Sequence, residues 1–310
     1  MMRLIVVVGK AGTERLMRVY NPSLQLVGSY QDGVCGAFNA VISSGTNLIT
    51  STFGCGTFFV NEFTPGGGLV LVSTRNPAGS YLSDAGNRNL ARDNAGWLYV
   101  VAVKDSTKVL LLERLGSGLS LQGSLEFNEP DDIIGGAAVA ATPGGDVYSV
   151  AIGSLPSGTN NHIYRTAGVA SLLAGTTVFG EGNPGNGGER SVVIDPNNLD
   201  VFYAGSGPFP GIQKFSSDLA GATQKTLFPT AALAILNGAN MYATEVNQQG
   251  SQDYVAHKFD FNALSGNAGG GGVNELASDG TYIYMARTDS ESAGMAEIFK
   301  ITPPNTLVSS

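Results

Sequence analysis

The chain has 310 residues, a formal net charge of −8 and a sequence pI near 4.7. Its 17 Lys and Arg residues are scattered singly, which argues against nucleic-acid binding, because surfaces that bind nucleic acids cluster basic side chains. Charged residues make up only 14% of the chain and glycine fills 43 positions, a composition that favours strands and tight turns over solvated helices.

The first element we predict is a strand near the N-terminus. The apolar run there spans only Leu4 to Val8, shorter than the ~7–15 apolar residues of a signal-peptide core. No stretch approaches the ~18–20 apolar residues that cross a membrane. We therefore expect no signal peptide and no membrane insertion, with the protein in a virion if it is viral and otherwise in the cytoplasm.

A short strand centred on an aromatic or bulky apolar residue recurs along the chain, at steps of roughly 40–50 residues. The central residues of these copies are Val6, Ile49, Tyr99, Tyr148, Phe202, Tyr242 and Tyr284. An apolar or small-residue strand and a turn signal precede most copies, as in the Pro-Gly-Gly of residues 143–145. Internal recurrence of this kind indicates a repeat architecture.

Two further strands are predicted after each copy. The third strands are predicted at 109–114, 163–166, 212–215, 255–259 and 298–301, and the fourth at 121–127, 176–179, 223–227 and 306–310. Four strands in a unit of roughly 40–50 residues match one blade of a β-propeller.

The chain is therefore predicted to be all-β, a single β-propeller domain over residues 1–310. We expect seven blades of four antiparallel strands, with six or eight as alternatives. Too few residues precede Leu4 to build an innermost strand, so the first unit starts at its second strand. The ring is then expected to close through face packing alone or with a three-stranded first blade.

The hairpin at residues 192–203, Val-Val-Ile-Asp-Pro-Asn-Asn-Leu-Asp-Val-Phe-Tyr, resembles those of the lactonase, NHL and YVTN type of seven-bladed propeller. The resemblance is one of architecture and implies no particular activity. The composition, low in charge and rich in Gly, Asn, Thr and Ala, is similar to that of virion proteins of tailed bacteriophages.

Cys35 and Cys55 lie ten residues on either side of Gly45. In an antiparallel hairpin centred on that glycine they face each other across the two strands of the second unit. Two states of this cysteine pair remain as alternatives, two buried reduced thiols or a disulfide. A zinc site is disfavoured, because no histidine lies nearby to complete the ligand set.

Chemistry in propellers usually lies at one mouth of the central channel, and the loops that lead into the innermost strands line that mouth. The polar residues in those loops are Asn39, Asn89, Glu189, Arg190, Asn274 and Glu275. Glu189 and Glu275, with the asparagine oxygens, would suit Ca²⁺ or another divalent cation. With Asp132 the set resembles the metal site of gluconolactonase-type enzymes. Solvated channel residues without catalytic function are the alternative.

Three functions follow from these observations. No catalytic signature stands out, which favours a non-enzymatic structural or binding component of a larger assembly, such as a phage tail, fibre or decoration protein. Its partners would be other proteins of the assembly, a host surface or a glycan. A metal-dependent lactonase-like hydrolase is the first alternative. The second is a glycan-binding lectin, for which Tyr30, Tyr81 and Phe209 are the exposed aromatic candidates.

Overall fold

A computed structural model of the chain gives the fold. The residues that it describes are 4–11, 14–44, 46–54, 57–65, 69–77, 80–81, 88–104, 107, 109–127, 132–155, 158–178, 190–205, 211–221, 223–225, 230–237, 240–246, 254–259, 264–268, 273–278, 281–288, 296–302 and 306–309. The chain divides into two compact units, Met1–Thr177 and Val178–Ser310. The single domain over residues 1–310 stays a prediction. Within the described ranges, no helix is long and apolar enough to span a membrane.

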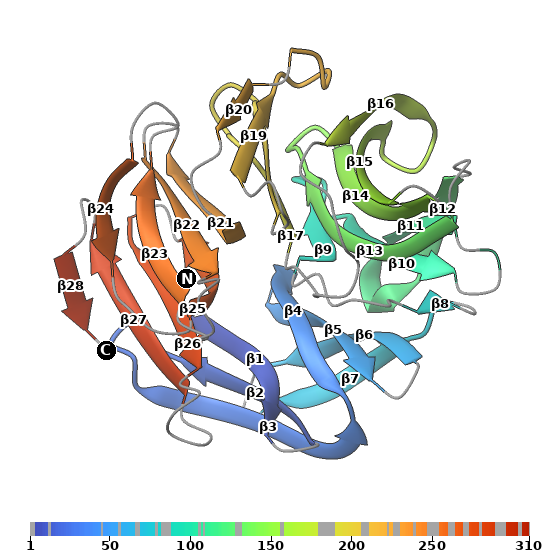
Figure 1. Ribbon diagram of the computed structural model, residues 1–310. Helices are drawn as coiled ribbons and strands as arrows, with labels where there is room; N and C mark the ends of the chain where they lie inside the picture. The colour runs from blue at the N-terminus through green and yellow to red at the C-terminus, as the bar shows by residue number, and fades with distance from the viewer. Residues whose placement is uncertain are drawn as a thin grey trace. The chain divides into compact units, whose positions relative to one another are not determined.

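The first unit contains four sheets, each built from strands that follow one another in the chain (Figure 1). The first sheet is β1 (Ile5–Ala11), β2 (Glu14–Tyr20) and β3 (Leu26–Cys35). The second is β4 (Ala37–Ser44), β5 (Asn47–Gly54), β6 (Thr57–Thr64) and β7 (Val70–Arg75). The third is β8 (Ser80–Tyr81), β9 (Leu90–Arg92), β10 (Leu98–Lys104), β11 (Val109–Leu115) and β12 (Leu121–Phe127), with the short 3-10 helix η1 (Ser117–Leu119) before β12. The fourth is β13 (Asp132–Ala141), β14 (Asp146–Leu155), β15 (Gly158–Ala167) and β16 (Leu172–Val178).

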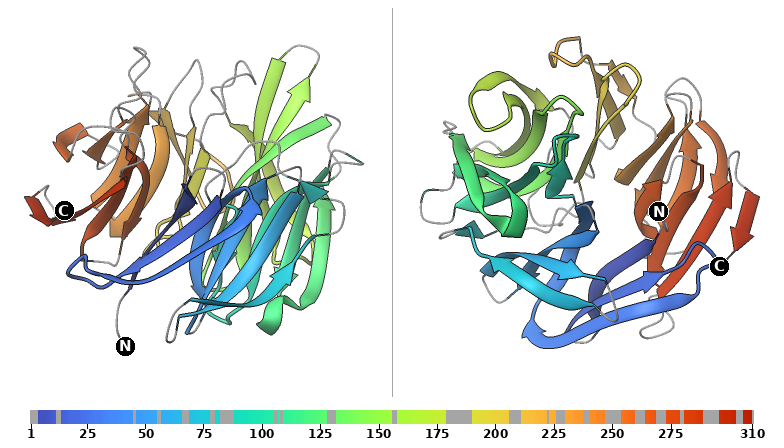
Figure 2. Two further views of the ribbon diagram at one scale, coloured as in Figure 1. Left: turned by 90° about the horizontal axis from the view of Figure 1, so that it is seen from below. Right: turned by 180° about the vertical axis from the view of Figure 1, so that it is seen from behind.

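The second unit contains three sheets of four strands each (Figure 2). The fifth sheet is β17 (Arg190–Ile194), β18 (Val201–Gly205), β19 (Gly211–Phe215) and β20 (Thr223–Lys225). The sixth is β21 (Thr230–Asn237), β22 (Asn240–Val246), β23 (Tyr254–Phe259) and β24 (Leu264–Ala268). The seventh is β25 (Val273–Ser278), β26 (Ile283–Thr288), β27 (Ala296–Thr302) and β28 (Thr306–Ser309).

The all-β class and the four-stranded antiparallel sheets are thus confirmed. Two details differ from the prediction. In the third sheet both β8 and β9 pair with β10, so that its first strand is interrupted. In the fourth sheet β16 begins at Leu172 rather than at residue 176, because a tight turn closed by the Ala167 N–H to Ser171 O hydrogen bond (3.0 Å) leads directly into it.

Five of the seven recurring bulky residues lie in second strands and are buried, whereas Val6 of β1 is half-buried and the side chain of Tyr242 lies outside the described residues. Ile49, Tyr99, Tyr148, Phe202 and Tyr284 each expose 8% or less of their surface. Burial of both strand faces also accounts for the continuous apolar runs, since Leu98 to Val103 of β10 are all buried.

Leucine with positive φ recurs in the turns between strands. Four turns carry one, an uncommon conformation for a residue with a branched side chain: Leu24 (60°), Leu119 (58°), Leu199 (62°) and Leu219 (63°). Leu119 and Leu219 precede the fourth strands β12 and β20. Leu24 precedes β3, but Leu199 precedes the second strand β18, so chain order decides the assignment: β3 is the last strand of its sheet and leads into β4, as β7, β12 and β16 lead into the sheets that follow them. β3 therefore takes the place of a fourth strand and β1 that of a second strand. The first sheet has three strands among the described residues, as one of the two sequence alternatives predicts.

Two apolar clusters hold the sheets of the first unit together face to face. The larger cluster joins the second, third and fourth sheets and includes Phe58, Leu112 and Tyr164, whereas the smaller joins the first and second sheets through Met17 and Phe63. In the smaller cluster Tyr30 lies 4.8 Å from Phe63 between ring centroids, at 65°. Edge-to-face contacts of this kind add to the stabilisation that burial provides.

Candidate functional site

The channel-mouth residues predicted from the sequence all lie in or next to first strands. Asn39 lies in β4, Asp132 and Arg190 begin β13 and β17, and Asn274 and Glu275 lie in β25. These five therefore belong to the strands themselves rather than to the loops before them. Their backbones are described and their side chains are not, and Glu189 lies outside the described residues. The divalent-cation site stays a prediction. The described residues contain no group of three His, Cys, Asp or Glu side chains that would hold a metal ion.

Asn89, which directly precedes β9, is fully buried. Its Oδ1 accepts a 2.6 Å hydrogen bond from the Ser51 hydroxyl of β5, and its backbone oxygen accepts one from the Val101 N–H at 3.2 Å. Its Nδ2 has no hydrogen-bond partner among the described residues. This amide therefore links the second and third sheets and faces protein rather than solvent.

The structure places Cys35 at the end of β3, opposite Glu14 of β2, and not in the hairpin of the second sheet. The hairpin of the second sheet does turn after Ser44, as predicted. A bulge in β4 between Phe38 and Ala40 shifts the pairing, so that Ala37 lies opposite Phe53. Cys55 lies outside the described residues. The pairing of Cys35 with Cys55 stays a prediction.

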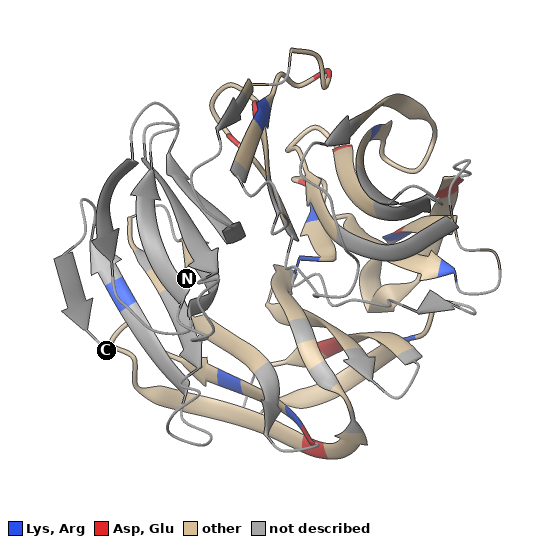
Figure 3. Cartoon of the chain, in the orientation of Figure 1, with Lys and Arg blue, Asp and Glu red and all other residues tan. Residues whose placement is uncertain are grey.

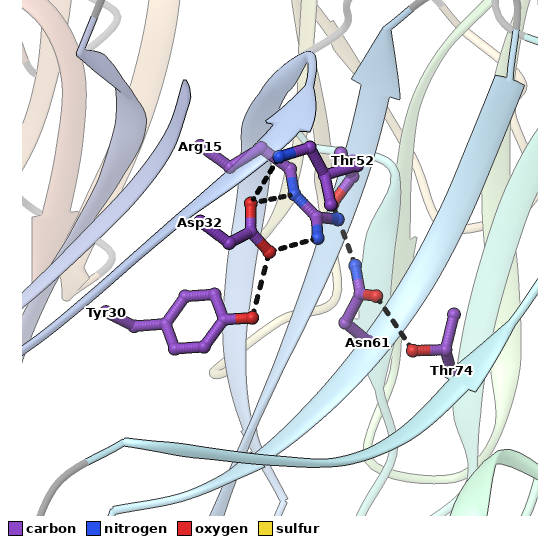
Figure 4. A network of polar contacts seen from close by, with 7 residues as sticks. Arg15, Tyr30, Asp32, Thr52, Asn61 and Thr74 are labelled. Carbon is purple, nitrogen blue, oxygen red and sulfur yellow. Dashed lines mark hydrogen bonds and ion pairs between the residues drawn. The ribbon is translucent and has the colours of Figure 1, made fainter. Parts of the chain in front are cut away.

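A buried ion pair that was not predicted from the sequence lies within the first sheet, and its arginine also contacts the second sheet (Figure 4). Arg15 of β2 and Asp32 of β3 are directly opposite each other, and the Arg15 side chain is 6% exposed. The guanidinium Nε donates to Asp32 Oδ1 at 3.0 Å, and Nη2 contacts Oδ2. The contact is bidentate, the strongest geometry for an arginine and a carboxylate.

Other donors complete the coordination of the Asp32 carboxylate. The Tyr30 hydroxyl donates to Oδ2 at 2.8 Å and the Val34 N–H to Oδ1 at 3.2 Å. Burial by itself would raise the pKa of Asp32, but hydrogen bonds from Arg15 and Tyr30 outweigh it and hold the pKa below its ordinary value. Burial and then the hydrogen bond to Asp32 raise the pKa of Tyr30. A carboxylate with both oxygens occupied in this way is suited to holding structure, not to proton transfer.

The network continues from the ion pair across the second sheet. Arg15 Nη1 donates to the Thr52 hydroxyl at 3.4 Å, and Arg15 lies over the Phe38 ring at 5.1 Å. Asn61 donates to the Thr52 hydroxyl at 2.8 Å, and the Thr74 hydroxyl donates to Asn61 Oδ1 at 3.2 Å. The chain of contacts runs from β5 through β6 to β7, so it fixes how the three-stranded sheet is placed against its neighbour.

Comparable polar contacts join the next sheets. Arg75 of β7 donates two hydrogen bonds to Glu113 of β11, at 2.9 and 2.8 Å. The Tyr99 hydroxyl of β10 donates to Asp93 at 3.0 Å, and it lies 3.5 Å from where a Cβ on Gly168 would be. Gly168 has φ of +55°, a conformation that favours glycine, and it packs against the tyrosine of the preceding sheet.

An exposed aliphatic surface follows the fourth strands of the first unit. We call it the outer-strand belt; its residues are each 37% to 55% exposed. They are Leu26 and Val27 of β3, Val70, Leu71 and Val72 of β7, Leu121 of β12, and Leu172 and Leu173 of β16. Four of them, Leu26, Val70, Leu121 and Leu172, are the first residues of their strands, so the surface recurs from sheet to sheet.

Successive outer strands approach each other where the second, third and fourth sheets meet. The Ser73 hydroxyl of β7 donates to the Gly118 oxygen of η1 at 3.1 Å. A Cβ on Gly123 of β12 would lie 2.8 Å from Val169, in the turn before β16, so only glycine fits this approach. β7 and β12 thus each touch the turn that precedes the next outer strand.

The outer strands carry few charges, as Figure 3 shows for the described residues. Their charged residues are Asp32, Arg75 and Glu126, which pair with Arg15, Glu113 and Lys104 respectively. β16 has none. A partner that meets the belt would therefore find aliphatic groups and no unpaired charge.

Comparisons with known proteins give a fold and no family. No protein-family model and no curated protein matches the sequence. Among solved structures, the propeller domain of the Trilobed protease from Pyrococcus furiosus is 10% identical, with a TM-score of 0.60, covering 99% of this chain and 94% of that one. The Dos1 propeller is 10% identical with a TM-score of 0.57, covering 96% and 77%. A chain of a mitotic checkpoint complex is 12% identical with a TM-score of 0.67, covering 97% and 85%.

The chain is a β-propeller. At these identities the similarity establishes the propeller fold alone and transfers no activity. The sheets are thus blades, and the number seven stays a prediction.

Proposed function

We propose that this propeller is a non-enzymatic structural or binding component of a larger assembly, and more specifically a tail, fibre or decoration protein of a bacteriophage virion. The observation that carries the proposal is the outer-strand belt. Exposed aliphatic residues that are grouped on neighbouring strands are uncommon on proteins that act alone and usually mark a surface that a partner covers.

The arrangement of the belt supports docking on a protein surface. Its aliphatic residues repeat at the start of four successive outer strands, and the charges on those strands are paired within the chain. A solvent-exposed edge in a soluble protein ordinarily carries lysine or proline, which prevent association. β3, β7, β12 and β16 contain neither residue.

The composition supports the viral setting. A chain low in charge and rich in Gly, Asn, Thr and Ala is similar in composition to virion proteins of tailed bacteriophages, and its net charge of −8 disfavours nucleic-acid binding. In a virion, the partners of this chain would be neighbouring structural proteins. The loops of the chain would contact a host surface or a glycan.

Particles made from the genome that encodes this chain test the proposal. Particles are purified on a density gradient, and the chain is quantified by mass spectrometry relative to the major particle protein. We expect a constant ratio for the wild type and at least about a tenfold loss for Leu26→Lys with Leu121→Lys, because the burial of two leucine side chains, each worth about 1.5–3 kcal/mol, is replaced by two charges.

The matched control places the same charges on the same strands. Ser29→Lys with Ser124→Lys alters exposed polar residues of β3 and β12, and it should leave the ratio unchanged. Finding the wild-type chain only in particle-free fractions would contradict the proposal.

A further inference from the structure

We propose that a strand from another protein of the assembly completes the first blade, where it pairs antiparallel with β1 in the position that first strands hold in the other blades. The inference deepens the proposed function and rests on it, since it names the form of one partner contact: an extended segment of small and β-branched residues. This contact is separate from the outer-strand belt, which lies on the fourth strands.

The first step is the position of β1 in its sheet. The strand order is β1-β2-β3, so β1 is terminal, and no described strand pairs with the edge that faces away from β2. β1 contacts β4, the first strand of the next blade, as the second strand β10 contacts β13 (Figure 1). β1 therefore holds the place of a second strand, and in each of the other sheets the second strand pairs with a first strand.

The second step is the burial of β1. Second strands elsewhere in the first unit are buried on both faces, as shown by Leu48 to Thr52 of β5, Leu98 to Val103 of β10 and Val147 to Ala151 of β14. Strands covered in this way have continuous apolar sequences. The run from Ile5 to Val8 is also continuously apolar, yet each of its residues is only half-buried. β1 thus has the sequence of an interior strand, while the described residues leave it partly exposed.

The third step is the backbone of β1. The strand pairs with β2 in continuous register from Ile5 to Ala11, without a bulge. Its other edge therefore presents a regular row of N–H and C=O groups, which an added strand can satisfy. The sequence IVVVGKA contains no proline, so every residue keeps its N–H. The group that complements such an edge is an extended backbone.

The fourth step is the chemistry of the added segment, which the first strands of the other blades specify. β17 and β21 have the sequences RSVVI and TAALAILN, in which small and β-branched residues prevail. Both run antiparallel to the second strands with which they pair. The single charge on β1 is Lys10, near the carboxyl end of the strand. An acidic residue at the amino-terminal end of an antiparallel segment would therefore meet an opposite charge, which favours pairing.

The fifth step is the source of the segment. Every described strand of this chain already pairs within a sheet, so a second copy would have to release a strand of its own. Two copies, each with a net charge of −8, would also repel each other. An extended segment of a different protein has neither cost, and we therefore assign the edge to a different protein.

The area sets the strength expected for an isolated segment. A standard interface buries about 800 Å² per partner over about 20–30 residues, or roughly 30–40 Å² per residue. A segment as long as the 7 residues of β1 would bury roughly 200–280 Å². We therefore expect a free segment to bind weakly, and a segment held on an assembled partner to bind tightly through its high effective concentration.

A synthetic peptide that copies residues 189–195, Glu-Arg-Ser-Val-Val-Ile-Asp, is the probe. It contains a first strand and has an acidic residue at its amino-terminal end. Fluorescence anisotropy of the labelled peptide, titrated with the purified chain, should give a Kd below about 1 mM. The matched control peptide carries Val192→Pro with Val193→Pro and should bind at least about tenfold more weakly, because one of two adjacent N–H groups points toward β1 and proline cannot donate it.

Hydrogen exchange locates the bound peptide. The amides of β1 should exchange at least about fivefold more slowly when the peptide is bound, whereas those of β16, a terminal strand of the fourth sheet, should be unchanged. The inference is overturned by no binding up to about 1 mM, by equal binding of the two peptides, or by slowing of β16 as large as that of β1. A chain that fails these tests and still enters particles overturns the strand contact alone and leaves the proposed function standing.

Discussion

The leucines with positive φ allow burial and backbone strain to be separated by substitution with glycine. Leu119 and Leu199 have φ of 58° and 62°, yet Leu119 is 4% exposed and Leu199 is 38% exposed. Glycine adopts this conformation without steric cost. Leu119→Gly and Leu199→Gly therefore relieve the same strain while removing different amounts of buried surface.

The two magnitudes follow from these exposures. Relief of the left-handed conformation is worth about 1–2 kcal/mol, and the extra freedom of glycine in the unfolded chain costs about 0.5–1 kcal/mol. Removing a buried leucine side chain costs about 3–5 kcal/mol once the cavity is included. Leu119→Gly should then lower the free energy of unfolding by about 2–4 kcal/mol, whereas Leu199→Gly should change it by less than about 1 kcal/mol.

Urea unfolding followed by circular dichroism measures both variants against the wild type. The comparison is sound only if the dependence of the unfolding free energy on urea is the same in all three proteins. The reasoning is refuted if Leu199→Gly destabilises the protein as much as Leu119→Gly, or if Leu119→Gly is neutral. Either result would show that burial of the leucine side chain does not determine how much the turn contributes to the free energy of unfolding.

Two further predictions concern buried polar groups. Arg15→Met should lower the free energy of unfolding by about 3–5 kcal/mol, because it leaves the Asp32 charge unpaired. The double variant Arg15→Met with Asp32→Leu should recover at least half of that loss in the same urea assay. No recovery in the double variant would contradict the ion-pair account. Stability should also fall between pH 10 and pH 12 by up to about 2–3 kcal/mol, because the pKa of Tyr99 is raised to about 12 by burial and then by its hydrogen bond to Asp93. A group with a raised pKa contributes its full stabilisation below its unfolded value of 10.0, and loses it as the pH rises through the folded value. Tyr99→Phe should reduce this fall and leave the part that the raised pKa of Tyr30 contributes, and a variant that keeps the whole fall would show that groups other than Tyr99 cause it.

Much of the fold could be predicted because its signals are local. The recurring residues Tyr99, Tyr148 and Phe202 mark second strands, since a bulky residue at one position of each repeat is buried in the same place in each blade. The three-stranded first sheet was also among the alternatives. The turns at Leu119 and Leu219 could not be foreseen, because positive φ normally indicates glycine or asparagine and these leucines adopt it to bury their side chains.

The candidate site was less accessible to sequence reasoning. The channel-mouth residues were chosen as polar groups before first strands, but Asn89 is enclosed between two sheets. The Arg15 network was missed, although an arginine in the alternating strand ERLMRVY, at a position where its neighbours are apolar, is a signal for a buried partner. Nothing in the sequence near Arg15 indicates Thr52 or Asn61.

By itself the sequence determined the β class, the repeat and the bulky residues that are buried in five of the second strands, because period, turn chemistry and hydrophobic pattern act over a few residues. Only the tertiary structure decided which polar groups meet and which aliphatic residues stay exposed. Arg15 and Val70 both lie on apolar strands, yet one is buried and the other is not. Whether a side chain is covered depends on the sheet packed beside it, and that neighbour comes from a distant part of the chain.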